Sequence, residues 1–144
     1  MRDIIFRGKR IDNGEWILNS ETYIRDGDGT WLSDKECNVV KVDPNTVGQF
    51  TGLLDKNGVR VFEGDLLRKP PKDQYEETSF VLFEVFYHDG NMCDSHIGWQ
   101  FNRLHFQGNI CGHSGWERFR PEYTGNMIVV GNIHDNLELL TEAK

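Results

Sequence analysis

Hydrophobic residues along this chain form short runs, many of them alternating with polar residues, and turn residues separate the runs about every ten positions. Helical spacing of apolar residues is nearly absent, and such a pattern is typical of β-strands joined by tight turns. The sequence therefore predicts a mostly β fold, either a small barrel or a rolled antiparallel sheet. It has a hairpin-rich N-terminal part and one or two short helical turns. An α+β fold is the alternative.

Two hairpins are predicted in the first half of the chain. One turns at Asp12-Asn13-Gly14 and the other at Asp55-Lys56-Asn57-Gly58, because Asn-Gly readily adopts the positive φ that tight hairpins need. Gly27, Asp28 and Gly29 predict a further turn. Strands are expected at residues 4–10, 15–18, 22–25, 38–42, 49–54 and 59–67.

Helical turns are expected at only two places. Asp43 is a good N-cap before Pro44, so one turn through Thr46 is predicted, and residues 136–142 could form a second turn capped by Asp135 or Asn136. Residues 80–87 are apolar on both faces and predict a central strand. Further strands are expected at 97–102 and 127–133, and loops at 68–78 and 107–115.

The chain of 144 residues is long enough for one domain with its own core. We expect a single domain over residues 1–144, with an N-terminal subdomain at 1–42 and a barrel-like part at 43–144 as a finer division.

The formal net charge of −7 argues against a protein that coats duplex DNA or binds an anionic membrane. No run approaches the roughly 20 apolar residues of a membrane span, and the N-terminal apolar run is too short for a signal peptide. A cytoplasmic location is expected. The three cysteines are an odd number, so reduced thiols are expected rather than a disulfide framework.

Two small basic clusters could still bind nucleic acid. Arg7, Lys9 and Arg10 form one, and Arg118 and Arg120 form the other beside Trp116. The overall charge favours the alternative interpretation, in which these residues form a solvated strand face.

One spacing resembles a metal site. Cys93-x-x-His96 and Cys111-x-His113 could supply four ligands to a tetrahedral zinc. The second pair is spaced more closely than in zinc fingers and ribbons, and a free cysteine is more often a packed residue. No metal ligand or cofactor is therefore assigned.

Three other patterns resemble functional motifs, but none of them is complete or favoured. Asp26-x-Asp28-Gly29 resembles the start of a calcium loop, but Cys37 stands where a glutamate is needed. Ser114 lacks the second glycine of a nucleophile elbow. Glu63 and Asp65 could face one side of an extended run as an acid–base pair, although a polar bend is favoured. We assign no catalytic residue.

Four tryptophans are many for this length. Trp99 lies in an alternating strand and is expected in the core. Trp31 and Trp116 lie beside glycine-rich segments and are the better candidates for a contact surface.

Three blocks of sequence resemble the YopX family of phage and prophage proteins. The central block runs from Val42-Asp43-Pro44-Asn45-Thr46-Val47-Gly48-Gln49-Phe50-Thr51-Gly52-Leu53 through Asp55-Lys56-Asn57-Gly58 to Phe62-Glu63-Gly64-Asp65. The ends agree at Ile5-Phe6-Arg7-Gly8-Lys9-Arg10, Asp12-Asn13-Gly14-Glu15-Trp16, Val130-Gly131-Asn132-Ile133-His134-Asp135-Asn136 and Glu138-Leu139-Leu140.

The resemblance implies a small phage or prophage accessory protein whose biochemical role is not established, and it carries no catalytic residues. We therefore expect a non-enzymatic protein-interaction or assembly module. Its expected partners are further copies of itself, as a homo-oligomer, and an unidentified phage or host protein. A nucleic-acid-associated protein of phage replication or regulation is the first alternative, and a zinc-dependent enzyme is the second.

Overall fold

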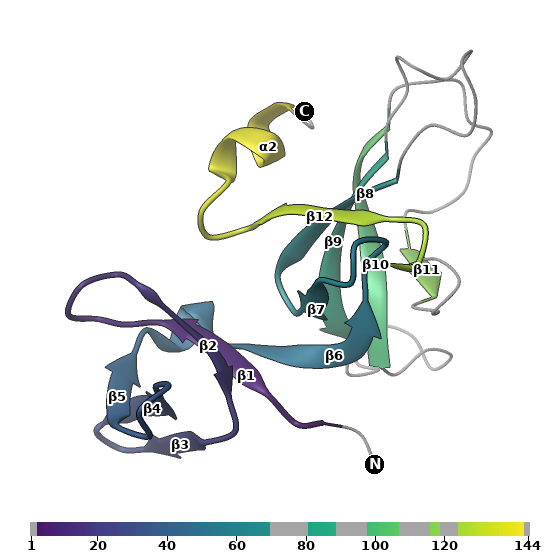
Figure 1. The fold of residues 1–144 in the computed structure, drawn as a ribbon. Coiled ribbons are helices and arrows are strands. Elements are labelled where there is room, and N and C mark those ends of the chain that lie inside the picture. Colours follow the sequence, from purple (N-terminus) through teal and green to yellow (C-terminus); the bar gives the residue numbers. More distant parts are fainter. Residues whose placement is uncertain (1–2, 70–80, 89–97, 107–115, 119–123, 143–144) are drawn as a thin grey trace. The chain divides into compact units, whose positions relative to one another are not determined.

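The computed structural model describes residues 3–69, 81–88, 98–106, 116–118 and 124–142. Strands dominate these residues, and the helical elements η1 and α2 are short, which confirms the predicted mostly β fold (Figure 1). The chain divides into two compact units, residues 1–52 and residues 53–144. Each unit is described by itself below.

The first unit is built from hairpins. In it β1 pairs antiparallel with both β2 and β6, while β3, β4 and β5 form a three-stranded antiparallel sheet in that order. The first six strands and the 3-10 turn are β1 (Phe6–Lys9), β2 (Trp16–Ser20), β3 (Tyr23–Asp26), β4 (Gly29–Ser33), β5 (Val39–Val42), η1 (Pro44–Thr46) and β6 (Gly48–Leu54).

The turn between β1 and β2 confirms the first predicted hairpin. Gly14 has φ +72°, and its N–H donates to the carbonyl of Arg10 at 3.0 Å. The register of the pair shifts between Phe6 and Gly8, and Asn19 on the partner strand has φ +59°. This irregularity is a β-bulge, which increases the local twist of the hairpin.

The turn η1 confirms the short helical turn predicted at Asp43-Pro44. The Asp43 carboxylate accepts the N–H of Asn45 at 3.0 Å. The hydroxyl of Thr46 donates to the Asp43 carbonyl at 2.7 Å and accepts the N–H of Lys9 at 2.8 Å. The turn is therefore bonded directly to β1.

A small core holds the first unit together. Ile17, Leu32 and Val42 are buried, and Phe6 and Val47 pack against them. A side chain at Gly8 would lie 3.1 Å from Leu32, so the glycine lets β1 approach this cluster closely. Strands of both sheets contribute to the one core.

The second unit contains a five-stranded antiparallel sheet in the order β11-β10-β9-β8-β12. The prediction of a central strand at 80–87 is confirmed, because β9 pairs with β8 on one side and β10 on the other. The elements after β6 are β7 (Arg60–Phe62), β8 (Asp65–Lys69), β9 (Val81–His88), β10 (Gly98–Phe106), β11 (Trp116–Arg118), β12 (Ile128–Asn132) and α2 (Leu137–Glu142).

The core of the second unit consists of buried side chains from four segments. Trp99 packs against it, as predicted for an alternating strand, and so does Val129. The buried members are Val61, Leu67, Phe83, Val85 and Met127.

The hairpin predicted around Asp55-Lys56-Asn57-Gly58 is confirmed, but its second strand is shorter than predicted. Residues 59–67 are not one extended run, since β7 ends at Phe62 and β8 begins at Asp65. Gly64 has φ +87°, which turns the chain between the two strands. Apolar residues on both sides of the turn concealed it.

Two strands of the structure are not predicted by the sequence. The pattern at residues 29–33 predicts a turn and its continuation, whereas the structure has β4 there, and no strand is predicted at residues 116–118, where the structure has β11. Most of the predicted loop at 68–78 and the whole of that at 107–115 lie outside the described residues.

Candidate functional site

The strand β3 forms one edge of the sheet β3-β4-β5. All four of its residues are exposed, and within the described part of the chain it pairs with β4 alone. An exposed edge presents unpaired backbone N–H and carbonyl groups and can therefore accept another strand.

The turn between β3 and β4 sets the direction of those backbone groups. It has two residues, and the Asp26 carboxylate accepts the N–H groups of Asp28 at 2.8 Å and Gly29 at 3.2 Å. These carboxylate contacts stabilise a β-turn at residues 26–29. The sequence pattern also favours a turn there over a calcium-binding loop. The two residues that flank a two-residue hairpin turn form a hydrogen-bonded pair. Farther along the two strands, hydrogen-bonded pairs alternate with pairs that make no hydrogen bonds to each other.

It follows that Asp26–Gly29 and Ile24–Trp31 are the hydrogen-bonded pairs between β3 and β4. The backbone N–H and carbonyl groups of Tyr23 and Arg25 then point away from β4, toward the open edge. This edge therefore offers two donors and two acceptors.

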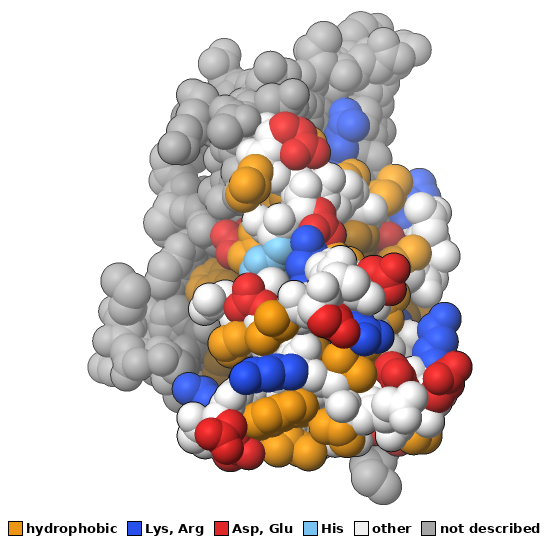
Figure 2. Space-filling model, turned by 90° about the vertical axis from the view of Figure 1, so that its left-hand side faces the viewer, with side chains coloured by type: hydrophobic (Ala, Val, Ile, Leu, Met, Phe, Trp, Pro, Cys, Tyr) orange, Lys and Arg blue, Asp and Glu red, His pale blue; other side chains and the backbone are white. Residues whose placement is uncertain are grey.

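The same sheet has an apolar surface on the side opposite its core. Trp31 lies opposite both Ile24 and Lys41, and Val39 lies opposite Ser33, so these side chains share one face. We call Ile24, Trp31, Val39 and Lys41 the outer face. Ile24 is 41% exposed and Val39 is 55% exposed, and Figure 2 shows that hydrophobic side chains reach the surface among charged ones.

The ammonium group of Lys41 lies over the ring of Trp31, with the nitrogen 5.8 Å from the ring centroid. A side chain at Gly29 would lie 2.6 Å from the Lys41 Cε atom, so the glycine makes room for this arrangement. Trp31 was one of the two tryptophans predicted to form a contact surface, and it lies on the outer face. Trp116 begins β11.

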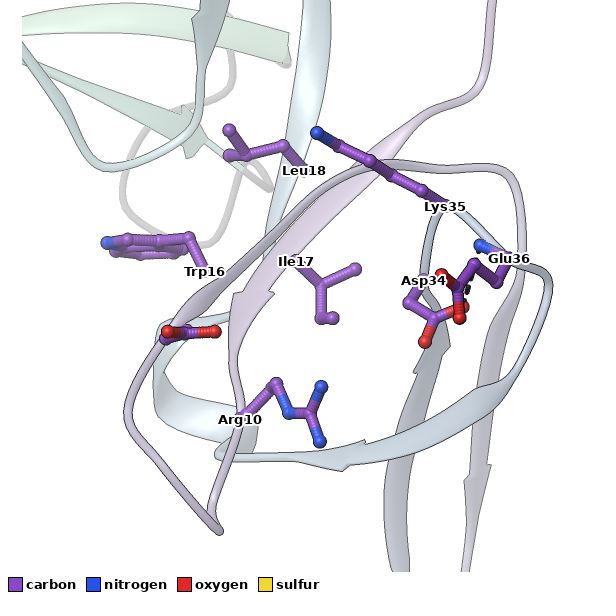
Figure 3. A pocket seen from close by; sticks show the side chains of 8 residues that line it. Arg10, Trp16, Ile17, Leu18, Asp34, Lys35 and Glu36 are labelled. Atoms are coloured by element: carbon purple, nitrogen blue, oxygen red, sulfur yellow. Dashed lines mark hydrogen bonds between the residues drawn. The ribbon is translucent and has the colours of Figure 1, made fainter.

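A second feature of the first unit is an open pocket of about 410 Å³. Figure 3 shows Trp16 and Leu18 at one side of it, Asp34 and Glu36 at the other, and Ile17 between them. The lining residues are Arg10, Glu15, Trp16, Ile17, Leu18, Asp34, Lys35 and Glu36. The pocket therefore combines charges of both signs with a small apolar floor.

Two carboxyl groups, Asp34 in the lining of this pocket and Asp12 beside its Arg10, have lowered pKa values. Two hydrogen bonds, of 2.8 and 2.6 Å, join the Arg10 guanidinium to Asp12, and they lower the pKa of that carboxyl group. The Asp34 carboxylate accepts the N–H of Asn38 at 2.9 Å, which lowers the pKa of Asp34. Neither group is suited to donate a proton near neutral pH.

The structure also places the basic residues proposed as a nucleic-acid patch. The Arg7 guanidinium and the Lys9 ammonium lie 5.1 and 5.4 Å from the centroid of the Trp16 ring, and Arg7 is buried. Arg10 is joined to Asp12 in an ion pair. Arg118 ends β11, and Arg120 lies outside the described residues. The N-terminal cluster is therefore engaged in contacts within the first unit.

The four residues weighed as zinc ligands, Cys93, His96, Cys111 and His113, lie outside the described residues, and so does Ser114. Within the described ranges, no group of three or more His, Cys, Asp or Glu side chains could hold a metal ion. In the same ranges, no helix is long and apolar enough to cross a membrane.

The Glu63 and Asp65 pair is not on one extended strand, because the backbone turns at Gly64. Asp65 is buried, and its carboxylate accepts the N–H of Phe62 at 2.7 Å. The polar bend favoured from the sequence is therefore correct, and the acid–base pair is not supported.

The open edge of β3 could not be found from the sequence. Its residues show no alternation strong enough to separate an edge from an interior strand, and β4, which fixes its direction, was not predicted. The only available signal was the turn at 27–29.

Comparison with known proteins identifies a matching family and a solved structure with a similar fold. A family profile described as "YopX protein" matches residues 5–141. Among solved structures, the crystal structure of protein EF1440 from Enterococcus faecalis is similar, with a TM-score of 0.59 and 23% sequence identity. The match covers 97% of this chain and 99% of that one. No match was found among curated proteins.

Proposed function

The chain belongs to the YopX family, and from that premise we propose that it is a phage or prophage accessory protein that acts through protein contacts and not through catalysis. The first of these contacts joins copies of the chain to one another. An unidentified phage or host protein is the expected further partner.

The observation that carries this proposal is the exposed edge strand β3 beside the apolar outer face. Exposed apolar side chains next to an open sheet edge are typical of surfaces that another protein covers. Ile24 and Val39 are the exposed hydrophobic side chains of the outer face, with exposed fractions of 41% and 55%.

The pocket supports the same interpretation. The pKa of Asp34, which lines the pocket, is lowered by its hydrogen bonds. Catalytic acids and bases are usually tuned the other way, toward the working pH. The charged groups are therefore better suited to contacts with a protein surface.

The proposal is tested by sedimentation velocity of the full chain over a concentration series. We expect association that weakens when Ile24→Lys and Val39→Lys are combined, because both substitutions place charge on the outer face. Val59→Lys is the matched control, since Val59 is 48% exposed but lies outside that face.

The control should associate like the parent chain. A parent chain that stays monomeric over the whole series would contradict the proposed self-association. Equal weakening by the control would contradict the assignment of the outer face.

A further inference from the structure

We propose that β3 pairs antiparallel with β3 of a second copy of this chain, about a two-fold axis that passes beside Ile24. The two three-stranded sheets then join into one continuous sheet of six strands. This inference rests on the proposed self-association and names the edge and the register that produce it.

The direction of the backbone groups limits the register. The outward N–H and carbonyl groups belong to Tyr23 and Arg25, so these residues must lie in the hydrogen-bonded pairs of the new ladder. A two-fold axis perpendicular to the sheet relates two antiparallel strands and keeps each side chain on its own face. Only registers that pair odd-numbered residues with odd-numbered residues meet both conditions.

Three such registers are available. Pairing Tyr23 with Tyr23 of the second copy uses the outward groups of one residue per strand. Pairing Arg25 with its own copy places two like charges directly opposite each other, which is unfavourable. Pairing Tyr23 with Arg25 of the second copy, and Arg25 with Tyr23, uses all four outward groups of each strand.

The side chains favour the third register as well. Each Arg25 guanidinium then lies opposite a Tyr23 ring, and a guanidinium is attracted to the face of such a ring. Tyr23 is 42% exposed and stacks on Phe6, with the ring centroids 5.0 Å apart, so the ring is already held in place. On the opposite face, Ile24 meets Ile24 of the second copy beside Trp31.

A second copy is the occupant that these features select. A two-fold interface must be self-complementary: if one residue contacts a second residue of the other copy, the second residue also contacts the first residue of that copy. The strand β3 meets this requirement in its backbone groups, in its Tyr23 and Arg25 side chains, and in the apolar Ile24 at the centre.

Disulfide trapping tests the register. The background chain carries Cys37→Ser, Cys93→Ser and Cys111→Ser. In it, Ile24→Cys places the new cysteine directly opposite the same cysteine of the second copy. The two residues form a non-hydrogen-bonded pair of the ladder, with Cα atoms about 4.5 Å apart. That separation suits a disulfide. Asp26→Cys is the matched control, because it lies on the same strand and face but about 13 Å from its own copy.

We expect mild oxidation to link the Ile24→Cys chain into covalent dimers at least about ten times faster than the Asp26→Cys chain. Equal rates, or faster linkage of Asp26→Cys, would overturn the register. Failure of both variants to link, with the parent chain still associating, would overturn the β3 edge but leave the proposed function standing.

A second pair of variants keeps all native cysteines. Ile24→Lys places two ammonium groups opposite each other at the axis and should shift the parent dimer to monomer in sedimentation velocity. Val39→Lys lies at a residue that is 55% exposed on β5, at the far side of the sheet, and should weaken the dimer much less than Ile24→Lys. A larger effect of Val39→Lys than of Ile24→Lys would place the contact at β5 and overturn pairing through β3.

Discussion

At the scale of single residues, buried carboxylates bind the backbone of turns. The Asp55 carboxylate accepts the N–H groups of Asn57 and Val59 at 2.8 and 2.9 Å with one oxygen, and that of Val129 at 3.0 Å with the other. It therefore fixes the β6–β7 turn and joins it to β12. Asp65 acts in the same way on Phe62, at 2.7 Å.

Replacement of Asp55 tests this role. Asp55→Ala leaves three backbone donors without their acceptor in a buried position, and we expect the free energy of unfolding to fall by about 2 kcal/mol. Urea denaturation followed by circular dichroism measures the change. The control is Asp28→Ala, at an exposed position, with an expected change below about 0.5 kcal/mol. Equal effects of the two substitutions would contradict the role of Asp55.

The glycine between β7 and β8 gives a second prediction for a single residue. Gly64 has φ +87°, and an added side chain there would meet His134 and Ile133 only at ordinary contact distances of 3.6 Å. The penalty of Gly64→Ala is therefore conformational, and we expect a loss of about 1–2 kcal/mol in the free energy of unfolding.

Gly27→Ala is the matched control for this substitution, because its added side chain would meet nothing within 4 Å and its φ is not positive. Urea denaturation should show little change for Gly27→Ala. A stable Gly64→Ala chain would show that the turn between β7 and β8 can adopt another conformation.

At the scale of elements, a charged residue lies in the central strand of the second unit. Glu84 on β9 lies opposite Leu66 on β8 and Asn102 on β10. Burial raises the pKa of Glu84, and the negative charge of Glu63 raises it further. The folded chain therefore binds this proton more readily than the unfolded chain, and the ionised group destabilises the fold at neutral pH.

The sign of the pH dependence follows from that raised pKa. Glu84→Gln should unfold at a higher temperature than the parent chain at pH 7, because the substitution removes the half-buried charge. The difference should shrink as the pH falls through the raised pKa toward the ordinary value of 4.5, since the parent group is then protonated as well. Thermal unfolding monitored at several pH values checks this.

Glu21→Gln, at an exposed position, is the control and should leave the unfolding temperature unchanged. A gain from Glu84→Gln that is the same at pH 7 and pH 4.5 would show that the effect does not come from the charge.

The sequence was sufficient for elements with strong local signals. The Asn-Gly turns at Gly14 and Gly58, the Asp43-Pro44 turn and the two-faced apolar strand β9 were all predicted, because each depends on the conformational preference of a few neighbouring residues. The strand β4 and the break at Gly64 were not predicted. Both depend on which strand lies opposite, and pairing between distant segments leaves little trace in a local pattern.

The candidate site was predicted only in part for the same reason. The position of Trp31 beside a glycine-rich turn makes it a candidate for a contact surface, and the structure places it on the outer face. The open edge beside it depends on the strand order β3-β4-β5, which a single sequence does not contain.

At the scale of the whole molecule, the net charge of −7 opposes binding to polyanions. We expect no salt-sensitive binding of a labelled single-stranded oligonucleotide in fluorescence anisotropy at low salt, because Arg7, Lys9 and Arg10 already contact Trp16 and Asp12. Binding that falls steeply with added salt, and that is lost when Arg118→Ala and Arg120→Ala are combined, would support a nucleic-acid-associated protein instead.

Self-association of the full chain can be read from one native mass spectrum of protein purified without chelator, which reports the number of copies and any bound metal. We expect a closed oligomer with an even number of copies and no metal, because pairing through β3 joins the chains two at a time. A monomer that carries one zinc ion would contradict both the proposed contacts and the proposal that the chain does not act through catalysis.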